Sequence, residues 1–360
     1  KKASNYMNGA NRRFERAAEL DQDAPPEPPV EPPAPLPDDK FPIERIPSNF
    51  DTSEYLLPKS IPPSAAPDVV GAFRIICQSS HFNYDDAIVY PGQPGASHLH
   101  EYYGNTLVNA NSTYETLRTT GDSTCMNPLN RSGYWIPAMK DGKGNVVRSN
   151  RVSLYYKRHP KGSASAYGDV VAQPDGLKAI FGFDMLGGPT TGSPWVLCAG
   201  KRYEIGEQLP ANCGESFKLL VNSQPCWDGV NLDSPDHRSH MANVVRNAST
   251  NWQNKCPDTH PKQVPQFTLS ADYSTGGEDI TDYRLSSDHH AGTVQFGSFH
   301  ADLWDGWDGP TKDLWTRNCL DLMLNCSDGD TGGGLIMKRW EGFSYTADPR
   351  LIPIPERPAP

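Results

Sequence analysis

The segment "SFKLLVNSQPCW" (residues 216–227) joins a run of apolar and branched residues to a polar stretch that contains a proline. Short apolar runs that are separated by Gly, Pro, Asn or Asp are typical of β-strands. Residues 311–326 are a candidate helix. Short strands, long irregular loops and few short helices predict a mainly β domain, built as a sandwich or a jelly roll. Further segments of this strand-like kind span residues 68–82, 84–92, 146–160, 193–206 and 292–304.

The first 67 residues differ in composition from the rest of the chain. Residues 10–20 carry apolar side chains at helical spacing, and residues 24–42 are rich in proline, which favours an extended polyproline II arm. The predicted parts are an N-terminal helix and arm, a disulfide-stapled β domain and a Pro-rich C-terminal extension. They span residues 1–67, 68–348 and 349–360.

Two arrangements would hold such an arm in place. It could cross to a neighbouring copy and drive self-association, or it could fold back over its own domain and cover a sheet edge. The apolar residues able to anchor it are Phe14, Phe41, Ile43, Ile46, Tyr55, Leu56 and Leu57.

The overall composition excludes two classes of partner. The chain has 360 residues and a formal net charge of −10, and it has no cluster of Lys and Arg that would hold nucleic acid. No apolar run approaches the ~20 residues of a membrane span. We therefore expect neither nucleic-acid binding nor a membrane span.

The cysteines indicate the compartment. None of their spacings is C-x-x-C, which disfavours a zinc ribbon or a thioredoxin motif and favours four disulfides over free buried thiols. We expect an extracellular or cell-surface protein. Cys319 and Cys326 are expected to pair, because a helix between them would bring its ends together, and the other pairings stay open. The eight cysteines are Cys77, Cys125, Cys198, Cys213, Cys226, Cys256, Cys319 and Cys326.

The segment "PGASHLHEYYGN" (residues 94–105) places His98 and His100 two residues apart, so that they share one face of a strand. Neighbouring imidazoles can begin a site for a divalent metal such as zinc or copper, with calcium as a further candidate. They can also form a general base with its orienting partner, or simply bond main-chain carbonyls. His98, His100 and His300 are the candidate metal ligands.

Three further segments bring histidine, aspartate and tryptophan together, at residues 225–240, 257–266 and 299–310. If their loops converge at one end of the sandwich, they would line a cleft in which carboxylates and imidazoles act and indoles hold a sugar. In the alternative, the Trp-Asp-Gly sequences are turns whose tryptophans pack inward, and burial is the favoured role of the tryptophans taken alone. The candidate catalytic residues are His98, His100, His240, His260, His300 and Asp302, and the candidate substrate-binding residues are Asp228, Trp227, Trp304 and Trp307.

Taken in order, five segments resemble a known family. They are "FRIICQSSHFNYDDAIVYPGQPGASHLHEYYGN", "SLYYKR", "PCWDGVNLDSPDHRSH", "CPDTHPKQVPQ" and "FHADLWDGW". This pattern is similar to the secreted domain called Domain of Unknown Function nineteen-ninety-six, which is widespread in fungi, also occurs in bacteria and is sometimes joined to carbohydrate-binding WSC modules. The resemblance covers about residues 73–320 and implies secretion, disulfides and a shared site, but no reaction. Fungal members tend to have asparagine where this chain has Asp305.

Two classes of function fit these features. The leading hypothesis is a cleft that binds or cleaves polysaccharide, either with or without a metal ion, in which a histidine or Asp302 would act as general base. The alternative is a structural subunit of an extracellular filament or surface assembly, joined through the Pro-rich arms. Neither hypothesis requires an enzyme, because a cleft that only binds polysaccharide needs no catalysis.

Overall fold

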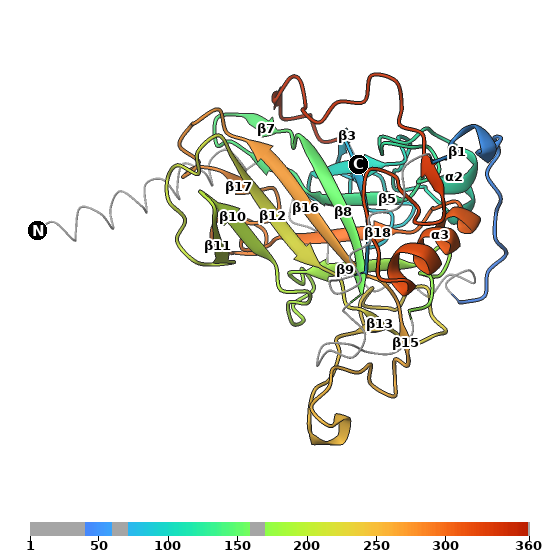
Figure 1. Ribbon diagram of the computed structural model, residues 1–360. Helices are drawn as coiled ribbons and strands as arrows, with labels where there is room; N and C mark the ends of the chain where they lie inside the picture. Colours follow the sequence, from blue (N-terminus) through green and yellow to red (C-terminus); the bar gives the residue numbers. More distant parts are fainter. Residues whose placement is uncertain (1–39, 60–70, 159–169, 359–360) are drawn as a thin grey trace, which may run out of the picture.

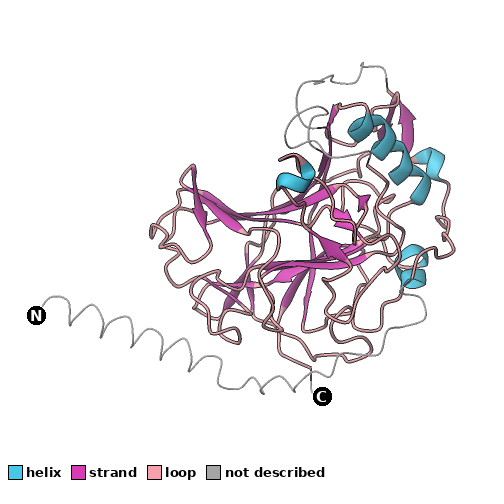
Figure 2. Ribbon diagram, turned by 90° about the horizontal axis from the view of Figure 1, so that it is seen from below, coloured by secondary structure: helices cyan, strands magenta, loops and turns pink. Residues whose placement is uncertain are grey.

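The computed structural model of the chain describes residues 40–59, 71–158 and 170–358. Two large β-sheets face each other across a shared apolar core, and the helices gather toward one side (Figures 1 and 2). This arrangement confirms the prediction of a mainly β domain with few short helices. The expected helix at residues 10–20 and the arm as far as residue 39 lie outside the described residues.

The larger sheet has seven strands and is antiparallel except where β19 runs parallel to β2. In spatial order its strands are β11 (Lys201–Glu204), β10 (Trp195–Cys198), β12 (Ser216–Asn222), β16 (Gln266–Ser274), β8 (Arg151–Arg158), β2 (Gly71–Cys77) and β19 (Asn325–Cys326). The facing sheet is antiparallel, with the order β3 (Ser79–Asn83), β4 (His100–Gly104), β5 (Gly133–Pro137), β18 (His300–Trp304) and β9 (Lys178–Gly182).

Three smaller sheets and five helical segments complete the described structure. One small sheet has the order β17 (Arg284–Leu285), β6 (Met139–Lys140), β7 (Asn145–Val147) and β21 (Leu351–Pro353). The others join β14 (Met241–Ala242), β13 (Cys226–Trp227) and β15 (Lys262–Gln263), and β1 (Leu56–Pro58) with β20 (Leu335–Met337). The helical segments are η1 (Thr52–Glu54), α2 (Tyr114–Thr119), η2 (Ala248–Thr250), α3 (Gly309–Trp315) and η3 (Thr316–Asp321).

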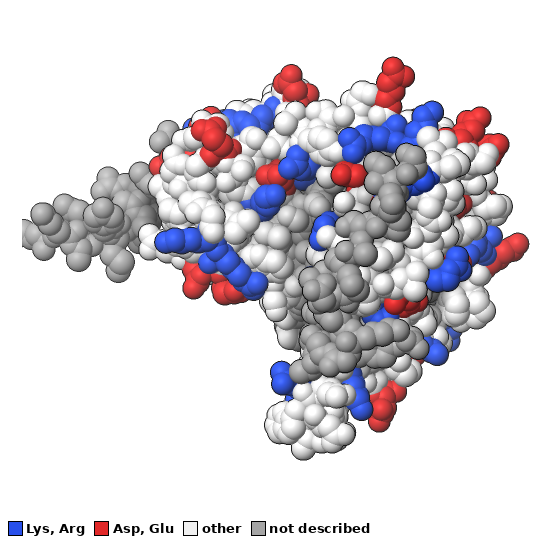
Figure 3. Space-filling view, viewed as in Figure 1, with Lys and Arg blue, Asp and Glu red and all other residues white. Residues whose placement is uncertain are grey.

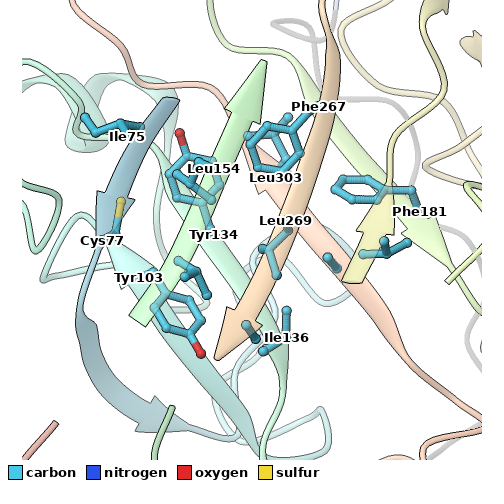
Figure 4. Packing of buried hydrophobic residues seen from close by; sticks show 14 of the residues in the cluster. Ile75, Cys77, Tyr103, Tyr134, Ile136, Leu154, Phe181, Phe267, Leu269 and Leu303 are labelled. Atoms are coloured by element: carbon cyan, nitrogen blue, oxygen red, sulfur yellow. The ribbon is translucent and has the colours of Figure 1, made fainter. Parts of the chain in front are cut away.

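Alternating burial explains how these strands pack. In β8 the side chains at every second position, such as Leu154 and Tyr156, are buried, because successive residues of a strand point to opposite faces. Phe267 of β16 bridges the two sheets, since its ring stacks on Tyr134 of β5 and meets Phe181 of β9 edge-on (Figure 4). The core of the sandwich therefore lies between these facing strands.

Two of the strand-like segments contain less strand than expected. Residues 84–92 form a loop, because one carboxylate oxygen of Asp86 accepts hydrogen bonds from the main-chain N–H groups of Ile88 and Val89 at 2.9 Å each. Such a bond replaces strand pairing with a local turn. In the segment 292–304, only β18 at its end is a strand.

All eight cysteines are paired, as predicted. Cys319 and Cys326 form the expected local disulfide between η3 and β19, with their Cα atoms 5.9 Å apart. The other disulfides are Cys77–Cys125, Cys198–Cys213 and Cys226–Cys256. Four disulfides are typical of a protein that folds in an oxidising compartment, which agrees with the expected extracellular location.

The described part of the N-terminal region, residues 40–59, lies on its own domain. Phe41 packs edge-on against Trp227 and donates its main-chain N–H to Val230, while Ile43, Tyr55 and Leu56 pack against the central core. These contacts agree with the arrangement in which the chain folds back over its own domain. They concern the described residues alone, and the self-association expected of the preceding arm stays a prediction.

A chain of charged side chains anchors this segment. Arg45 bonds Asp175 at 2.6 Å, and Lys312 of α3 bonds both Asp175 and Asp305 at 2.7 and 2.6 Å. Asp305, which follows β18, is thus linked to Arg45 of the N-terminal segment through Lys312 and Asp175. At the other end of the chain, β21 pairs with β7, so that residues 351–353 also belong to a sheet of the domain.

The described helices are all too short or too polar to cross a membrane. This finding agrees with the expected lack of a membrane span.

Candidate metal centre

The outer face of the five-stranded sheet carries most of the candidate site. His100 and Tyr102 lie on this face of β4, and His300 and Asp302 lie on it in β18, because residues two apart share a face. The register sets Trp135 of β5 between Tyr102 and Asp302. The same strands turn Tyr103, Tyr134 and Leu303 inward to the central core. The side chains of the outer face do not belong to that core.

Three histidines converge at one end of this face. The ring centroids of His98 and His100 are 4.2 Å apart, and that of His300 lies 5.2 Å from the first and 6.2 Å from the second. One nitrogen from each ring can be chosen so that all three atoms lie within 4.8 Å of one another. All three side chains are buried. The structure therefore brings together the three residues that the sequence identified as candidate metal ligands.

Main-chain carbonyls fix the orientation of two of these rings. His100 donates its Nδ1 hydrogen to the carbonyl of Asp85 at 2.9 Å, and His300 donates its Nδ1 hydrogen to the carbonyl of Ser298 at 2.8 Å. In the neutral tautomer that makes such a bond, Nε2 keeps its lone pair. Nε2 of His100 is buried and finds no hydrogen-bond partner within the described residues. Ligand histidines in metalloproteins are usually oriented in this way.

Burial keeps the imidazoles of His100 and His300 neutral. Burial lowers the pKa of His100 well below its usual value, and positive charge on His98 or His300 would lower it further. Burial and His98 have the same effect on the pKa of His300. Neutral imidazole is the form that binds a metal ion, so the site is prepared for a cation near neutral pH.

Asp302 adds a buried carboxyl group beside the histidines. Its Oδ2 atom lies 4.0 Å from Nε2 of His300, and neither of its oxygens accepts a hydrogen bond from the part of the chain that the structure describes. Burial and the nearby carboxylate of Asp86 raise the pKa of Asp302 well above its usual value, against the opposing charge of Arg238. A buried carboxyl that accepts no hydrogen bond is costly for a fold, which makes it a candidate functional group.

Two loops cover this face. The first loop joins β3 to β4 and contains Asp85. The carboxylate of Asp85 accepts main-chain hydrogen bonds from Gly95 and Ala110, and its carbonyl accepts from His100 and Tyr102. The second loop, residues 228–240, runs along the edge strand β9. The main-chain N–H groups of Lys178 and Ile180 in β9 donate hydrogen bonds to the carbonyls of Leu232 and His237 in this loop.

His240 and His260 do not join the three-histidine group. His240 donates from Nε2 to the carbonyl of Lys178 and accepts at Nδ1 from Ser234. His260, which is half-buried, donates to the carbonyl of Ser239 and accepts from Thr259. With both nitrogens engaged, these side chains fasten the second loop.

The candidate substrate-binding residues are spread over different environments. Trp307 lies in the central core and donates to the Tyr156 hydroxyl at 3.0 Å, and Trp227 is buried against Phe41. Asp228 uses one oxygen to accept from the main chain of the turn that follows it. Trp304 alone of the four lies on the outer face, where Lys178 stands 4.9 Å from its ring centre.

Two residues of this region were not selected from the sequence. Asp233 accepts a hydrogen bond from Nδ1 of His237 at 2.9 Å, and Lys178 lies 3.6 Å from the other oxygen of Asp233. Burial works against charge on His237, but the bond to Asp233 outweighs it and raises the pKa of His237. The other is Asp86, a buried carboxyl whose pKa is raised by burial. The four-residue spacing of Asp233 and His237 was the available signal.

Fold and site together define a disulfide-bonded β-sandwich with a buried three-histidine centre on the outer face of one sheet. A family model described as "Domain of unknown function (DUF1996)" matches residues 86–307, and the chain belongs to this family. The matched region contains His98, His100, His300 and Asp302. Searches of curated protein sequences and of solved structures find no match to this chain.

Proposed function

We propose that this protein is an extracellular metalloprotein that acts on carbohydrate, with His98, His100 and His300 as the ligands of a divalent transition metal. One observation carries the proposal. His100 and His300 both bond carbonyls through Nδ1, and the three rings can offer nitrogen atoms within 4.8 Å of one another. Three converging histidines, two of them oriented by main-chain carbonyls, match the three-histidine set of a catalytic zinc site.

The donor atoms favour zinc or copper over calcium. Imidazole nitrogen suits zinc, copper, iron and nickel, whereas calcium takes oxygen ligands in larger numbers. Three histidines leave a coordination position for water or substrate. When bound, the metal would supply a Lewis acid and an activated water. Asp302 is the group of this chain best placed to accept a proton there or to complete the ligand set.

The carbohydrate part of the proposal is supported by the residues beside the histidines. His300, Asp302 and Trp304 alternate along β18, so imidazole, carboxyl and indole share one face. A carboxyl group is the usual acid or base of glycoside cleavage, and an indole offers a flat apolar surface to a sugar ring. All three side chains are at most about one-twentieth exposed, so a glycan would reach them only if the covering loops move.

Metal analysis tests the proposal directly. The purified protein is stripped with a chelator, reloaded separately with zinc and copper, and analysed for bound metal. We expect one equivalent in the unmodified protein and loss of binding in His100→Ala and His300→Ala. The control is His289→Ala, because His289 is an exposed histidine outside the group. Equal metal content in all of these variants, or no binding by the unmodified protein, would refute the metal site.

A further inference from the structure

A hairpin projects from the three-stranded sheet, away from the body of the sandwich (Figure 1). Val245 and Lys255 pair across it through two main-chain hydrogen bonds of 2.8 and 3.1 Å. The disulfide between Cys226 and Cys256 ties its base to β13. The hairpin is therefore a supported element and can carry a side chain at a defined position.

The tip of this hairpin presents a tryptophan to solvent. Trp252 is 62% exposed, whereas Trp135, Trp307 and Trp315 are fully buried. Exposure of so large an apolar side chain gains nothing for folding, since the stabilisation comes from removing apolar surface from water. The ring is therefore available to a ligand.

The main chain around Trp252 is held on both sides. Its N–H donates to the carbonyl of Asn247 at 2.9 Å, and its carbonyl accepts from Nε of Arg246 at 2.7 Å. Asn247 and Thr250 also cap each other through reciprocal side-chain bonds of 3.2 and 3.0 Å. Both Asn251 and Trp252 have positive φ angles, 52° and 59°, which residues other than glycine rarely adopt. These hydrogen bonds hold Trp252 in a backbone conformation that is otherwise unfavourable for it.

The tip of the hairpin is polar, and its own residues include no acid. Residues 241–256 contain no Asp or Glu, although the whole chain has a net charge of −10. The tip carries the amides of Asn247, Asn251 and Gln253, flanked by Arg246 and Lys255. In the space-filling view the projection is mostly uncharged, with basic and acidic side chains beside it (Figure 3). Amides donate and accept hydrogen bonds, as neighbouring sugar hydroxyls require.

We propose that Trp252 and the amides around it form a carbohydrate-binding site separate from the metal centre. One face of a pyranose ring is made of C–H groups, which can stack on the exposed indole while Asn251 and Gln253 bond the hydroxyls at its edge. The site would fasten the domain to an extracellular glycan. This inference rests on the carbohydrate part of the proposed function and is independent of the metal ligands.

Binding to polysaccharide tests this site. The full chain, Trp252→Ala and Trp252→Tyr are incubated with insoluble chitin, insoluble β-1,3-glucan and immobilised polygalacturonate, and the bound fraction is measured. We expect the unmodified protein to bind at least one polymer, Trp252→Ala to bind it about tenfold or more weakly, and Trp252→Tyr to retain most of the affinity. Binding to the acidic polymer alone would identify an acidic glycan as the ligand, through Arg246 and Lys255.

Two controls isolate the contribution of Trp252 to glycan binding. Leu322→Ala removes another exposed apolar side chain, 61% exposed, and should leave binding unchanged. Metal content should be the same in Trp252→Ala as in the unmodified protein, so failure of the metal centre and failure of this site are distinguishable. The proposal is overturned if Trp252→Ala binds as the unmodified protein does, or if the unmodified protein binds none of the polymers. It is also overturned if Trp252→Ala changes the oligomeric state in sedimentation and no glycan is bound.

Discussion

The two faces of the five-stranded sheet use the same strands for opposite purposes. The inner face turns Tyr103, Tyr134 and Leu303 into the central core, where they meet apolar and aromatic partners of the larger sheet (Figure 4). The outer face buries His100 and Asp302 together with side-chain atoms that have no hydrogen-bond partner among the described residues. Apolar burial stabilises a fold, whereas burial of unpartnered polar atoms costs free energy. The inner face therefore maintains the fold, and the outer face carries the histidines and the carboxyl of the proposed metal site.

The largest expected effect is on the inner face. Leu303→Ala removes a side chain that is 2% exposed and should lower the free energy of unfolding by about 2–5 kcal/mol, through lost burial and a residual cavity. The folded fraction should still bind metal, because Leu303 points away from the histidines. Denaturant unfolding measures the stability, and Leu322→Ala is the exposed control, expected to change it by less than about 0.5 kcal/mol. A loss of metal from folded Leu303→Ala would show that the two faces are coupled.

A second prediction concerns Asp305, a buried carboxyl just after the end of β18. Burial raises the pKa of Asp305 to about 6 from 3.8, in spite of its bond to Lys312. Because the folded state then binds more protons than the unfolded state between these values, this group makes stability fall as pH rises from about 4 to 7, by up to about 3 kcal/mol. Asp305→Asn should remove this dependence.

The measurement is the free energy of unfolding of both proteins at several pH values across that range. Asp313→Asn, which changes an exposed partner of Arg45, is the matched control and should keep the dependence of the unmodified protein. Parallel curves for Asp305→Asn and the unmodified protein would mean that Asp305 is ionised throughout.

The smallest expected effect concerns Asp302 on the outer face. Because its carboxyl has a strongly raised pKa and accepts no hydrogen bond from the described residues, Asp302→Asn should leave the stability of the metal-free protein within about 1 kcal/mol of the original. The same change should weaken metal binding by about 10–100-fold, the usual effect of removing a polar group next to the ligands. Competition with a chelator measures the affinity. Asp228→Asn, whose carboxylate serves its own turn, should not change it.

The features predicted from the sequence were those that depend on local pattern. His98 and His100 share a face because they are two apart in sequence, and Cys319 pairs with Cys326 because they are only seven positions apart. The mainly β class followed from short apolar runs between turn residues. Such signals need no knowledge of the loops.

Features that depend on loop packing were not predictable in this way. Asp86 would point away from Asp85 on a strand, but the segment is a loop in which both are buried. His240 and His260 belong to the same His-rich stretches as the candidate ligands, yet their ring nitrogens are used by Ser234, Lys178, Thr259 and Ser239. Composition does not reveal which hydrogen bonds a histidine will make once its loop has folded.

The loop beside β9 also covers an edge of the five-stranded sheet that could otherwise pair with another molecule. The outward N–H groups of Lys178, Ile180 and Gly182 are taken by Leu232, His237 and Thr191, and the carbonyl of Gly182 accepts from Arg238. An edge strand whose hydrogen-bonding groups are already satisfied cannot serve as a template for a strand of another molecule. The same loop follows β13, where Cys226 is linked to Cys256. We expect reduction of that single bond to loosen the cover and to leave this sheet edge open to pairing with another molecule.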